Sequence, residues 1–89
     1  MGDSDYTIAF ARSARKELER LEAEVVSRLF PKIELLAQQP RPRGCRKLAG
    51  RQGLWRIRIG DYRVVYSIDD VAKVVDIIAI RHRSDVYDH

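Results

Sequence analysis

The sequence predicts an α+β domain in which two helices pack on one face of a four-stranded, mostly antiparallel sheet. Three observations lead to this fold class. A short apolar segment opens the chain, two segments with the 3.6-residue period of amphipathic helices follow, and three segments rich in β-forming residues come last. Because 89 residues leave room for only one modest core, we expect residues 1–89 to form a single domain.

The opening elements are a strand and the first helix of a helical hairpin. Residues 6–10, YTIAF, are short, apolar and rich in β-formers, which is typical of a strand. Residues from about 11 to 21 carry one apolar stripe, with most of the charges elsewhere, and therefore predict a helix. The stripe consists of Ala14, Leu18 and Leu21.

A second helix is expected from about residue 24 to residue 38. Pro31 lies inside it and could kink it or mark its early part as a separate turn. The segment PRPRGCR, Pro40 to Arg46, ends this helix and begins an irregular basic connection that runs to about Gly53. The apolar residues at helical spacing are Val26, Leu29, Phe30, Ile33, Leu36 and Ala37.

Three strands complete the predicted fold as an antiparallel meander. Leu54–Gly60 alternates apolar residues with arginines, Tyr62–Ile68 is dense in valine and tyrosine, and Ala72–Arg81 is almost continuously apolar. The last segment is therefore predicted to be the central strand, covered on both faces. The face of the sheet without helices is expected to be partly open.

The composition excludes several classes of protein. No run of 18 apolar residues exists, and the N-terminus lacks the basic-then-apolar order of a signal peptide, so we expect a cytoplasmic protein with no membrane contact. The single cysteine, Cys45, cannot form an internal disulfide. No cysteine–histidine cluster has metal-ligand spacing, and we expect neither a metal nor a cofactor.

Positive charge is concentrated in the middle of the chain. Between Pro40 and Tyr66, eight basic residues meet one acid, Asp61, which leaves a local balance of +7 within a total of +4. Such a block is typical of a protein that binds a polyanion, although a merely solubilising surface stays possible. The eight are Arg41, Arg43, Arg46, Lys47, Arg51, Arg56, Arg58 and Arg63.

The hairpin WRIRIGDYRVVY, residues 55–66, directs three of these arginines to one face. If Gly60-Asp61 is a two-residue loop, Arg58 lies directly opposite Arg63, and Arg56 shares their face. Opposed like charges cost roughly 0.2–1 kcal/mol, and a bound anion would remove that cost. Guanidinium groups suit phosphate oxygens. The alternative is that the arginines extend into water and cover apolar neighbours with their stems.

The C-terminal segment RHRSDVY brings three more candidates to one end of the sheet. Arg81, Arg83 and Tyr87 return there after the last strand. A tyrosine beside arginines can stack on a base or transfer a proton, although Tyr87 taken alone is more typical of a frayed terminal aromatic. Strand alternation points His82 away from Arg81 and Arg83.

Together, KLAG (residues 47–50), WRIRIGDYRVVY and RHRSDVY resemble the RelE toxins of bacterial type II toxin–antitoxin systems, within the wider RelE/ParE group. The resemblance spans nearly the whole chain and implies the RelE-like microbial RNase fold. It also implies a metal-independent endoribonuclease that cuts messenger RNA in the ribosomal A site and so inhibits translation. A cognate RelB-like antitoxin is the implied restraining partner.

The resemblance also assigns catalytic residues position by position. Arg56 and Arg58 match two basic residues on the first hairpin strand, and Arg63 matches the transition-state arginine. Arg81 matches the leaving-group acid, and Tyr87 the C-terminal tyrosine. The best-known relatives have lysines at the first two positions, so a lysine-like base is in doubt here. The basic residues expected to bind RNA are Arg43, Arg46, Lys47, Arg51 and Arg83.

Two other functions stay open from the sequence. A ParE-like inhibitor of DNA gyrase would share the fold without cutting RNA, and a non-catalytic basic module would bind RNA with strong salt dependence but leave it intact. The full catalytic set favours the RelE-like function.

Overall fold

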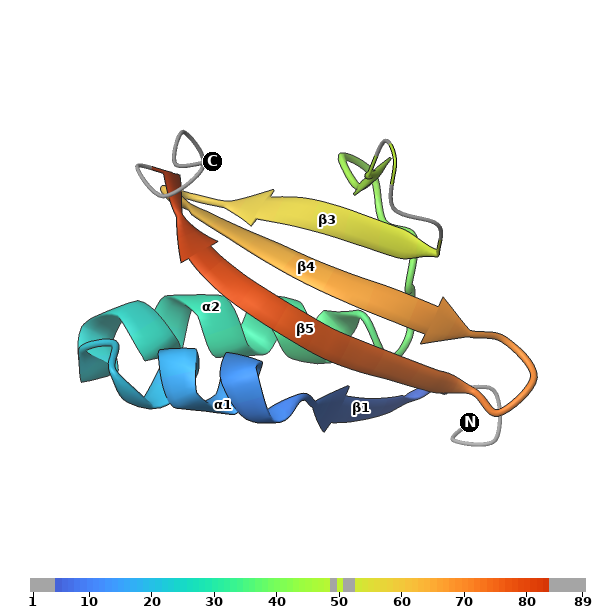
Figure 1. The fold of residues 1–89 in the computed structure, drawn as a ribbon, viewed down its shortest axis with the longest axis horizontal. Coiled ribbons are helices and arrows are strands. Elements are labelled where there is room, and N and C mark those ends of the chain that lie inside the picture. Colours follow the sequence, from blue (N-terminus) through green and yellow to red (C-terminus); the bar gives the residue numbers. More distant parts are fainter. Residues whose placement is uncertain (1–4, 49, 51–52, 84–89) are drawn as a thin grey trace.

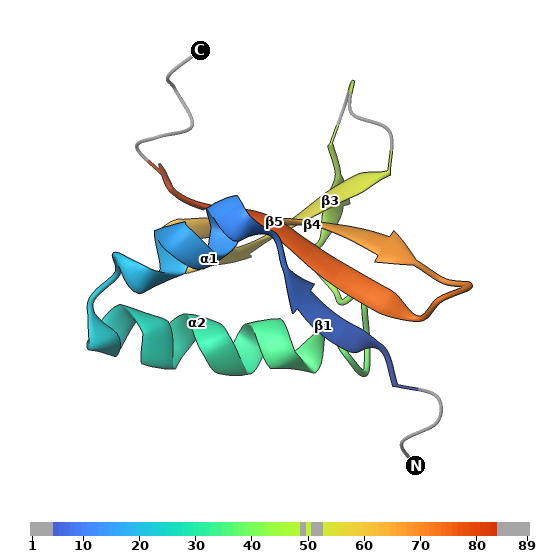
Figure 2. The ribbon, with the colours of Figure 1, turned by 60° about the horizontal axis from the view of Figure 1, so that its bottom comes forward.

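A computed structural model describes residues 5–48, 50 and 53–83 and shows two helices packed on one face of a five-stranded mixed sheet (Figures 1 and 2). This confirms the predicted α+β class. The elements are β1 (Thr7–Phe10), α1 (Arg12–Glu19), α2 (Ala23–Leu35), β2 (Arg46–Lys47), β3 (Leu54–Ile59), β4 (Tyr62–Asp69) and β5 (Val74–His82). Among the described residues, no helix has the length and apolar character needed to cross a membrane.

The order of strands in the sheet is β1-β5-β4-β3-β2. Among the described strands, only the β1–β5 pair is parallel, and the other three pairs are antiparallel. The prediction that the last strand is central was therefore wrong: β4 is the middle strand, and β5 lies between it and β1. The prediction of four strands missed β2, because Arg46–Lys47 is too short and too polar to produce a periodic signal.

The pairing between β4 and β5 contains an irregularity that decides which way the end of β5 faces. Val65 pairs with Ala79, but the next residue of β4, Tyr66, pairs with Ile77, so Ile78 is an extra residue on β5. Such a bulge reverses the alternation of side chains beyond it. Ile77 and Ile80 consequently both face the helices, although they are three residues apart, and both are buried.

Where β1 ends, Ala11 and helix α1 form hydrogen bonds to the edge of β5 in place of a neighbouring strand. The backbone N–H of Ala11 donates to the carbonyl of Ile77 (2.8 Å), and the hydroxyl of Ser13 donates to that of Ile78 (3.1 Å). One turn later, the backbone N–H of Ile80 donates to Oε1 of Glu17 (2.8 Å). Side chains of a helix thus satisfy backbone groups that a neighbouring strand would otherwise have paired.

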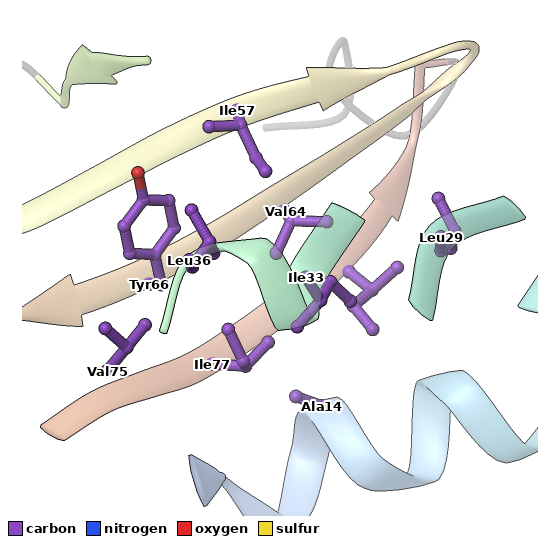
Figure 3. Close-up of a cluster of buried hydrophobic side chains, with 10 residues drawn as sticks. Ala14, Leu29, Ile33, Leu36, Ile57, Val64, Tyr66, Val75 and Ile77 are labelled. Atoms are coloured by element: carbon purple, nitrogen blue, oxygen red, sulfur yellow. The ribbon is translucent and has the colours of Figure 1, made fainter. Parts of the chain in front are cut away.

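The core lies between α2 and the sheet (Figure 3). Leu29, Ile33 and Leu36 line the buried side of α2 and of the turn that follows it, at the spacing of one helix face. In α1, Ala14 is the only fully buried residue and lets the helix approach closely, while the partly buried Leu18 also packs against the core. The sheet contributes Ile57, Val64, Tyr66, Val75, Ile77 and Ile80.

Pro31 does not interrupt α2, which runs continuously from Ala23 to Leu35. Its ring lies on the exposed side of the helix, where the carbonyl deprived of a donor can be hydrated. Both helices are shorter than predicted at their C-terminal ends, at Glu19 rather than residue 21 and at Leu35 rather than residue 38. Helix ends carry weaker sequence signals than helix centres.

Polar contacts fasten the start of the basic connection to the rest of the fold. The buried hydroxyl of Tyr66 donates to the carbonyl of Pro40 (2.8 Å), and burial raises the pKa of Tyr66. Nη2 of Arg41 donates to Oδ2 of Asp70 (3.0 Å), while the hydroxyl of Tyr6 donates to Oδ1 (2.6 Å). The guanidinium of Arg41 also lies 5.2 Å from the ring centre of Trp55. The connection therefore leaves α2 in a defined direction.

Candidate functional site

Three arginines form a row across the side of the sheet that faces away from the helices, which we call the open face. Arg58 on β3 pairs directly with Arg63 on β4, and Arg63 pairs directly with Arg81 on β5. Directly paired residues of antiparallel strands point to the same face. We call Arg58, Arg63 and Arg81 the arginine row. The predicted hairpin register, with Arg58 opposite Arg63, is confirmed.

Two further arginines share the open face beside the row. Arg56 lies two residues before Arg58 on β3 and pairs with Val65, so it has the orientation that the sequence predicted. Arg46 on β2 pairs directly with Arg56 and therefore joins the same face. Five arginines thus project from four neighbouring strands in the described part of the sheet.

The open face is strongly positive. Partial burial lowers the pKa of Arg56 first, and the charges of Arg63, Arg58 and Arg46 lower it further. Within the described residues, Arg46, Arg56, Arg58 and Arg63 have no acidic partner. Since opposed like charges on a sheet are unfavourable, this arrangement fits a face whose partner is an anion.

Arg81 reaches the row because of the bulge at Ile78. Simple alternation from the buried Ile77 would turn residue 81 toward the helices, whereas the extra residue turns it to the open face. Bulges commonly re-aim side chains in this way. The sequence contains no local sign of the bulge, because residues 74–80 are almost uniformly apolar.

Glu17 is a residue of this site that sequence reasoning missed. Its Oε2 lies 3.2 Å from Nη1 of Arg81, while its Oε1 accepts the hydrogen bond from Ile80. The Glu17 side chain is 24% exposed, and the Arg81 side chain is 55% exposed. One acid thus links α1 to the arginine at the end of the row. Its partners lie more than 60 residues away in sequence, so no short motif could have revealed it.

The other predicted site residues lie in different places. Lys47 is on the opposite face from Arg46, with Nζ 5.8 Å from the ring centre of Trp55, and so is not beside the row. Arg43 lies in the connection before β2, where it lines one cavity with Arg46 and Arg56 and a second with residues of α2. Arg83 lies beside the hairpin turn, where it forms an exposed ion pair with Asp61 at 3.8 Å. Arg51 and Tyr87 lie outside the described residues.

His82 is turned away from the arginine row. It pairs with Tyr62 across β4 and β5, and the two rings meet edge to face with centres 5.1 Å apart. The predicted orientation of His82, away from Arg81, is confirmed. The titratable ring of His82 therefore belongs to the helix side of the sheet and not to the open face.

Comparison with known proteins identifies relatives over almost the whole chain. Residues 8–87 match the family model described as the ParE toxin of type II toxin–antitoxin systems, parDE. Toxin RelE of Mycobacterium tuberculosis is 35% identical over 86 residues, with 96% of this chain and 89% of that toxin covered. Toxin RelG of the same organism is 30% identical over 86 residues, covering 92% and 95%.

Solved structures of similar chains agree with these matches. The toxin–antitoxin complex RelBE2 of M. tuberculosis contains a chain with a TM-score of 0.80 and 30% identity, covering 93% of this chain and 97% of that one. The isolated E. coli RelE toxin gives a TM-score of 0.76 and 31% identity, covering 92% and 90%. The archaeal RelE–RelB complex of Pyrococcus horikoshii gives 0.77 and 31%, covering 89% and 96%.

Proposed function

The chain belongs to the RelE/ParE superfamily and is a toxin of a type II toxin–antitoxin system, and from this we propose that it is an endoribonuclease that cuts messenger RNA in the ribosomal A site. The observation that carries the proposal is the arginine row. Three guanidinium groups from three strands lie on one face, with no acid between Arg58 and Arg63. Guanidinium groups match phosphate oxygens in geometry and charge.

The proposed reaction uses a nucleophile that RNA itself carries. The 2′-hydroxyl attacks the adjacent phosphorus, the bond to the 5′ oxygen breaks, and a 2′,3′-cyclic phosphate remains on the upstream fragment. Arg58 and Arg63 neutralise the charge that grows on the phosphate oxygens, which is the largest contribution that such a site can make. No metal ion or cofactor is needed to generate the nucleophile.

Two proton transfers complete the reaction. A guanidinium group cannot act as a base near pH 7, so the arginines at positions 56 and 58 cannot take the 2′ proton. We assign this role to Tyr87, while Arg81 assists the departing 5′ oxygen as a hydrogen-bond donor, and the proton that this oxygen gains comes from water. Because the site has no ordinary general base, positioning of the message by the ribosome supplies the missing proximity effect.

The proposed partners follow from the same family membership. Similar chains have been solved in complex with RelB antitoxins, which supports a RelB-like antitoxin as the partner that restrains this toxin. The message and the ribosome are its proposed targets, and both place its action in the cytoplasm.

A ParE-like action on DNA gyrase is the second candidate, because the matching family model is described as a ParE toxin. Such a toxin would inhibit by binding, and the opposed arginines of the row would then have no phosphodiester to cut. The two candidates differ in whether translated RNA is broken.

Primer extension on a translated message, with and without ribosomes, tests the proposal. We expect cuts inside codons only when ribosomes are present. Replacing Arg58 and Arg63 together with glutamine should reduce cutting by at least about 100-fold, the effect of losing one transition-state donor or more. The matched control replaces Arg12 and Arg15, two exposed arginines of α1, and should cut normally. Gyrase-dependent DNA damage without RNA cuts would establish the ParE-like function instead.

A further inference from the structure

A second group of arginines surrounds a cavity at the outer edge of the open face. The cavity has a volume of about 500 Å³ and lies beside the short strand β2. Among the described residues, six line the cavity, of which four are arginines and none is acidic. The lining consists of Arg43, Gly44, Arg46, Arg56, Ile57 and Arg58. Only Arg58 belongs also to the arginine row.

The fold builds this cavity from three segments. The pairing of β2 with β3 places Arg46 beside Arg56, and Arg58 follows two residues later on β3. Arg43 comes from the connection, where Gly44 has a φ of +93° and so turns the chain in a way that disfavours other residues. The anchors of Tyr66 on Pro40 and of Asp70 on Arg41 fix where this connection begins.

The cations of this region fall into two kinds. Arg41 is paired with Asp70 and lies over Trp55, and Lys47 lies over the same ring. In contrast, Arg43, Arg46 and Arg56 have no acidic or aromatic partner within the described residues. Solvation alone would not require three unpartnered arginines to converge on one cavity, since directly opposed like charges are unfavourable.

The spacing of the two arginine groups suggests what fills the cavity. Arg56 precedes Arg58 by two residues on the same strand, a separation of roughly 6.5 Å at the usual rise of a strand. This is close to the distance between consecutive phosphates of an RNA strand. A phosphate bound at the arginine row would therefore place its neighbour at the cavity.

We propose that Arg43, Arg46 and Arg56 form a second phosphate subsite, which holds the RNA phosphate adjacent to the one bound at the arginine row. The naming of RNA as the ligand rests on the proposed function, while the subsite itself rests on the cavity and its charges. Arg58 lies between the two phosphates and contacts both. The subsite fixes the position of the RNA strand, because two phosphates held one nucleotide apart prevent the RNA from sliding along the face.

The test uses a trinucleotide whose sugars carry 2′-methoxy groups, so that it has two internal phosphates and cannot be cut. Two analogues each replace one of these phosphates with an uncharged methylphosphonate and keep all three bases. NMR titration at low ionic strength measures the affinity of each for the full-length protein. We expect the wild type to bind the fully charged trinucleotide about tenfold more tightly than the analogues, the scale of one hydrogen-bonded charged contact.

The Arg43→Gln/Arg46→Gln variant should bind the charged and the singly neutralised trinucleotides with similar affinity. The matched control, Arg12→Gln/Arg15→Gln, loses the same charge elsewhere and should keep the tenfold difference. If the subsite variant keeps the difference, or if the wild type shows none, the inference is wrong. The single variant Arg43→Gln lies in an exposed loop and provides the same comparison if the double variant folds poorly.

These outcomes separate the subsite from the nuclease. If the wild type distinguishes the trinucleotides but never cuts a translated message, the subsite is supported and the proposed nuclease activity is wrong. If the wild type cuts the message but the subsite variant still distinguishes the trinucleotides, the nuclease activity is supported and the subsite is wrong.

Discussion

Glu17 is the side chain through which α1 reaches the arginine row. It holds Arg81 with one oxygen and the backbone of Ile80 with the other, so the guanidinium has a fixed neighbour and keeps its remaining donors for a phosphate. Glu17→Gln preserves an acceptor for Ile80 but removes the charge that orients Arg81. We expect single-turnover cleavage on ribosomes to slow about tenfold, or about 1.4 kcal/mol in the barrier.

The affinity of the Glu17→Gln variant for RNA should be unchanged or higher, because an acid has been removed from a positive face. That division between rate and affinity is what distinguishes a positioning residue from a structural one. Glu19→Gln, on the same helix and exposed, is the control. Faster cleavage by Glu17→Gln would show that the carboxylate restrains Arg81 rather than orients it.

Tyr87 is assigned a proton transfer that its ring alone cannot perform. Tyr87→Phe keeps an aromatic ring for stacking and removes the hydroxyl, so single-turnover cleavage should fall by at least about tenfold. Tyr87→Ala removes both and should additionally weaken binding of the message. An unchanged rate in Tyr87→Phe, with a defect only in Tyr87→Ala, would leave stacking as the whole role of this residue.

Asp70 makes the stability of the fold depend on pH. Hydrogen bonds from Arg41 and then Tyr6 lower the pKa of Asp70 below its usual value of 3.8. A lowered pKa in the folded state stabilises the protein fully above the unfolded value, and this contribution is lost as the pH falls from about 4 through the folded value. Asp70→Asn should therefore lower the urea midpoint at pH 7.

The difference in urea midpoint between wild type and Asp70→Asn should shrink as the pH is lowered below about 4. Asp5→Asn, at a carboxylate outside this cluster, should leave the wild-type pH dependence in place. A constant difference across the whole acid range would mean that the Asp70 carboxylate contributes nothing through its charge.

At the scale of elements, the predictable parts of the site are those that local turn chemistry decides. The two-residue loop Gly60-Asp61 sets the register of the β3–β4 hairpin, so the facing of Arg58 and Arg63 followed from sequence. The bulge at Ile78, the pairing of β2 and the contact of Glu17 depend on segments that meet only in the folded chain. A continuous apolar run indicates that a strand is buried but not which strands flank it. This explains why β5, rather than β4, was predicted to be the central strand.

The anchor between β4 and the basic connection allows a direct test at this scale. Tyr66→Phe leaves the core filled but removes the donor from the carbonyl of Pro40. We expect the free energy of unfolding, measured with urea, to fall by about 1 kcal/mol. Tyr62→Phe, in a partly buried ring of the same strand, is the control and should change stability less. Equal stability of wild type and Tyr66→Phe would show that water replaces the lost hydrogen bond.

At the scale of the whole molecule, the distribution of charge divides the protein into a stabilising side and a binding side. The helix side supplies the apolar core, whereas the open face gathers arginines that repel one another. Arg63 is central to this repulsion because it is directly paired with both Arg58 and Arg81. The face is therefore less favourable for the free protein than a neutral one would be.

Replacing Arg63 with glutamine should consequently stabilise the free protein while it abolishes the proposed cleavage of RNA. Each opposed like-charge pair that is removed contributes roughly 0.2–1 kcal/mol, less where Glu17 already compensates Arg81. The gain in melting temperature should be largest at about 0.01 M salt and shrink toward 0.15 M, as the screening length falls from about 30 to about 8 Å. Arg15→Gln on α1 should show no such gain. If the Arg63→Gln variant is less stable than the wild type at low salt, repulsion within the arginine row does not destabilise the free protein.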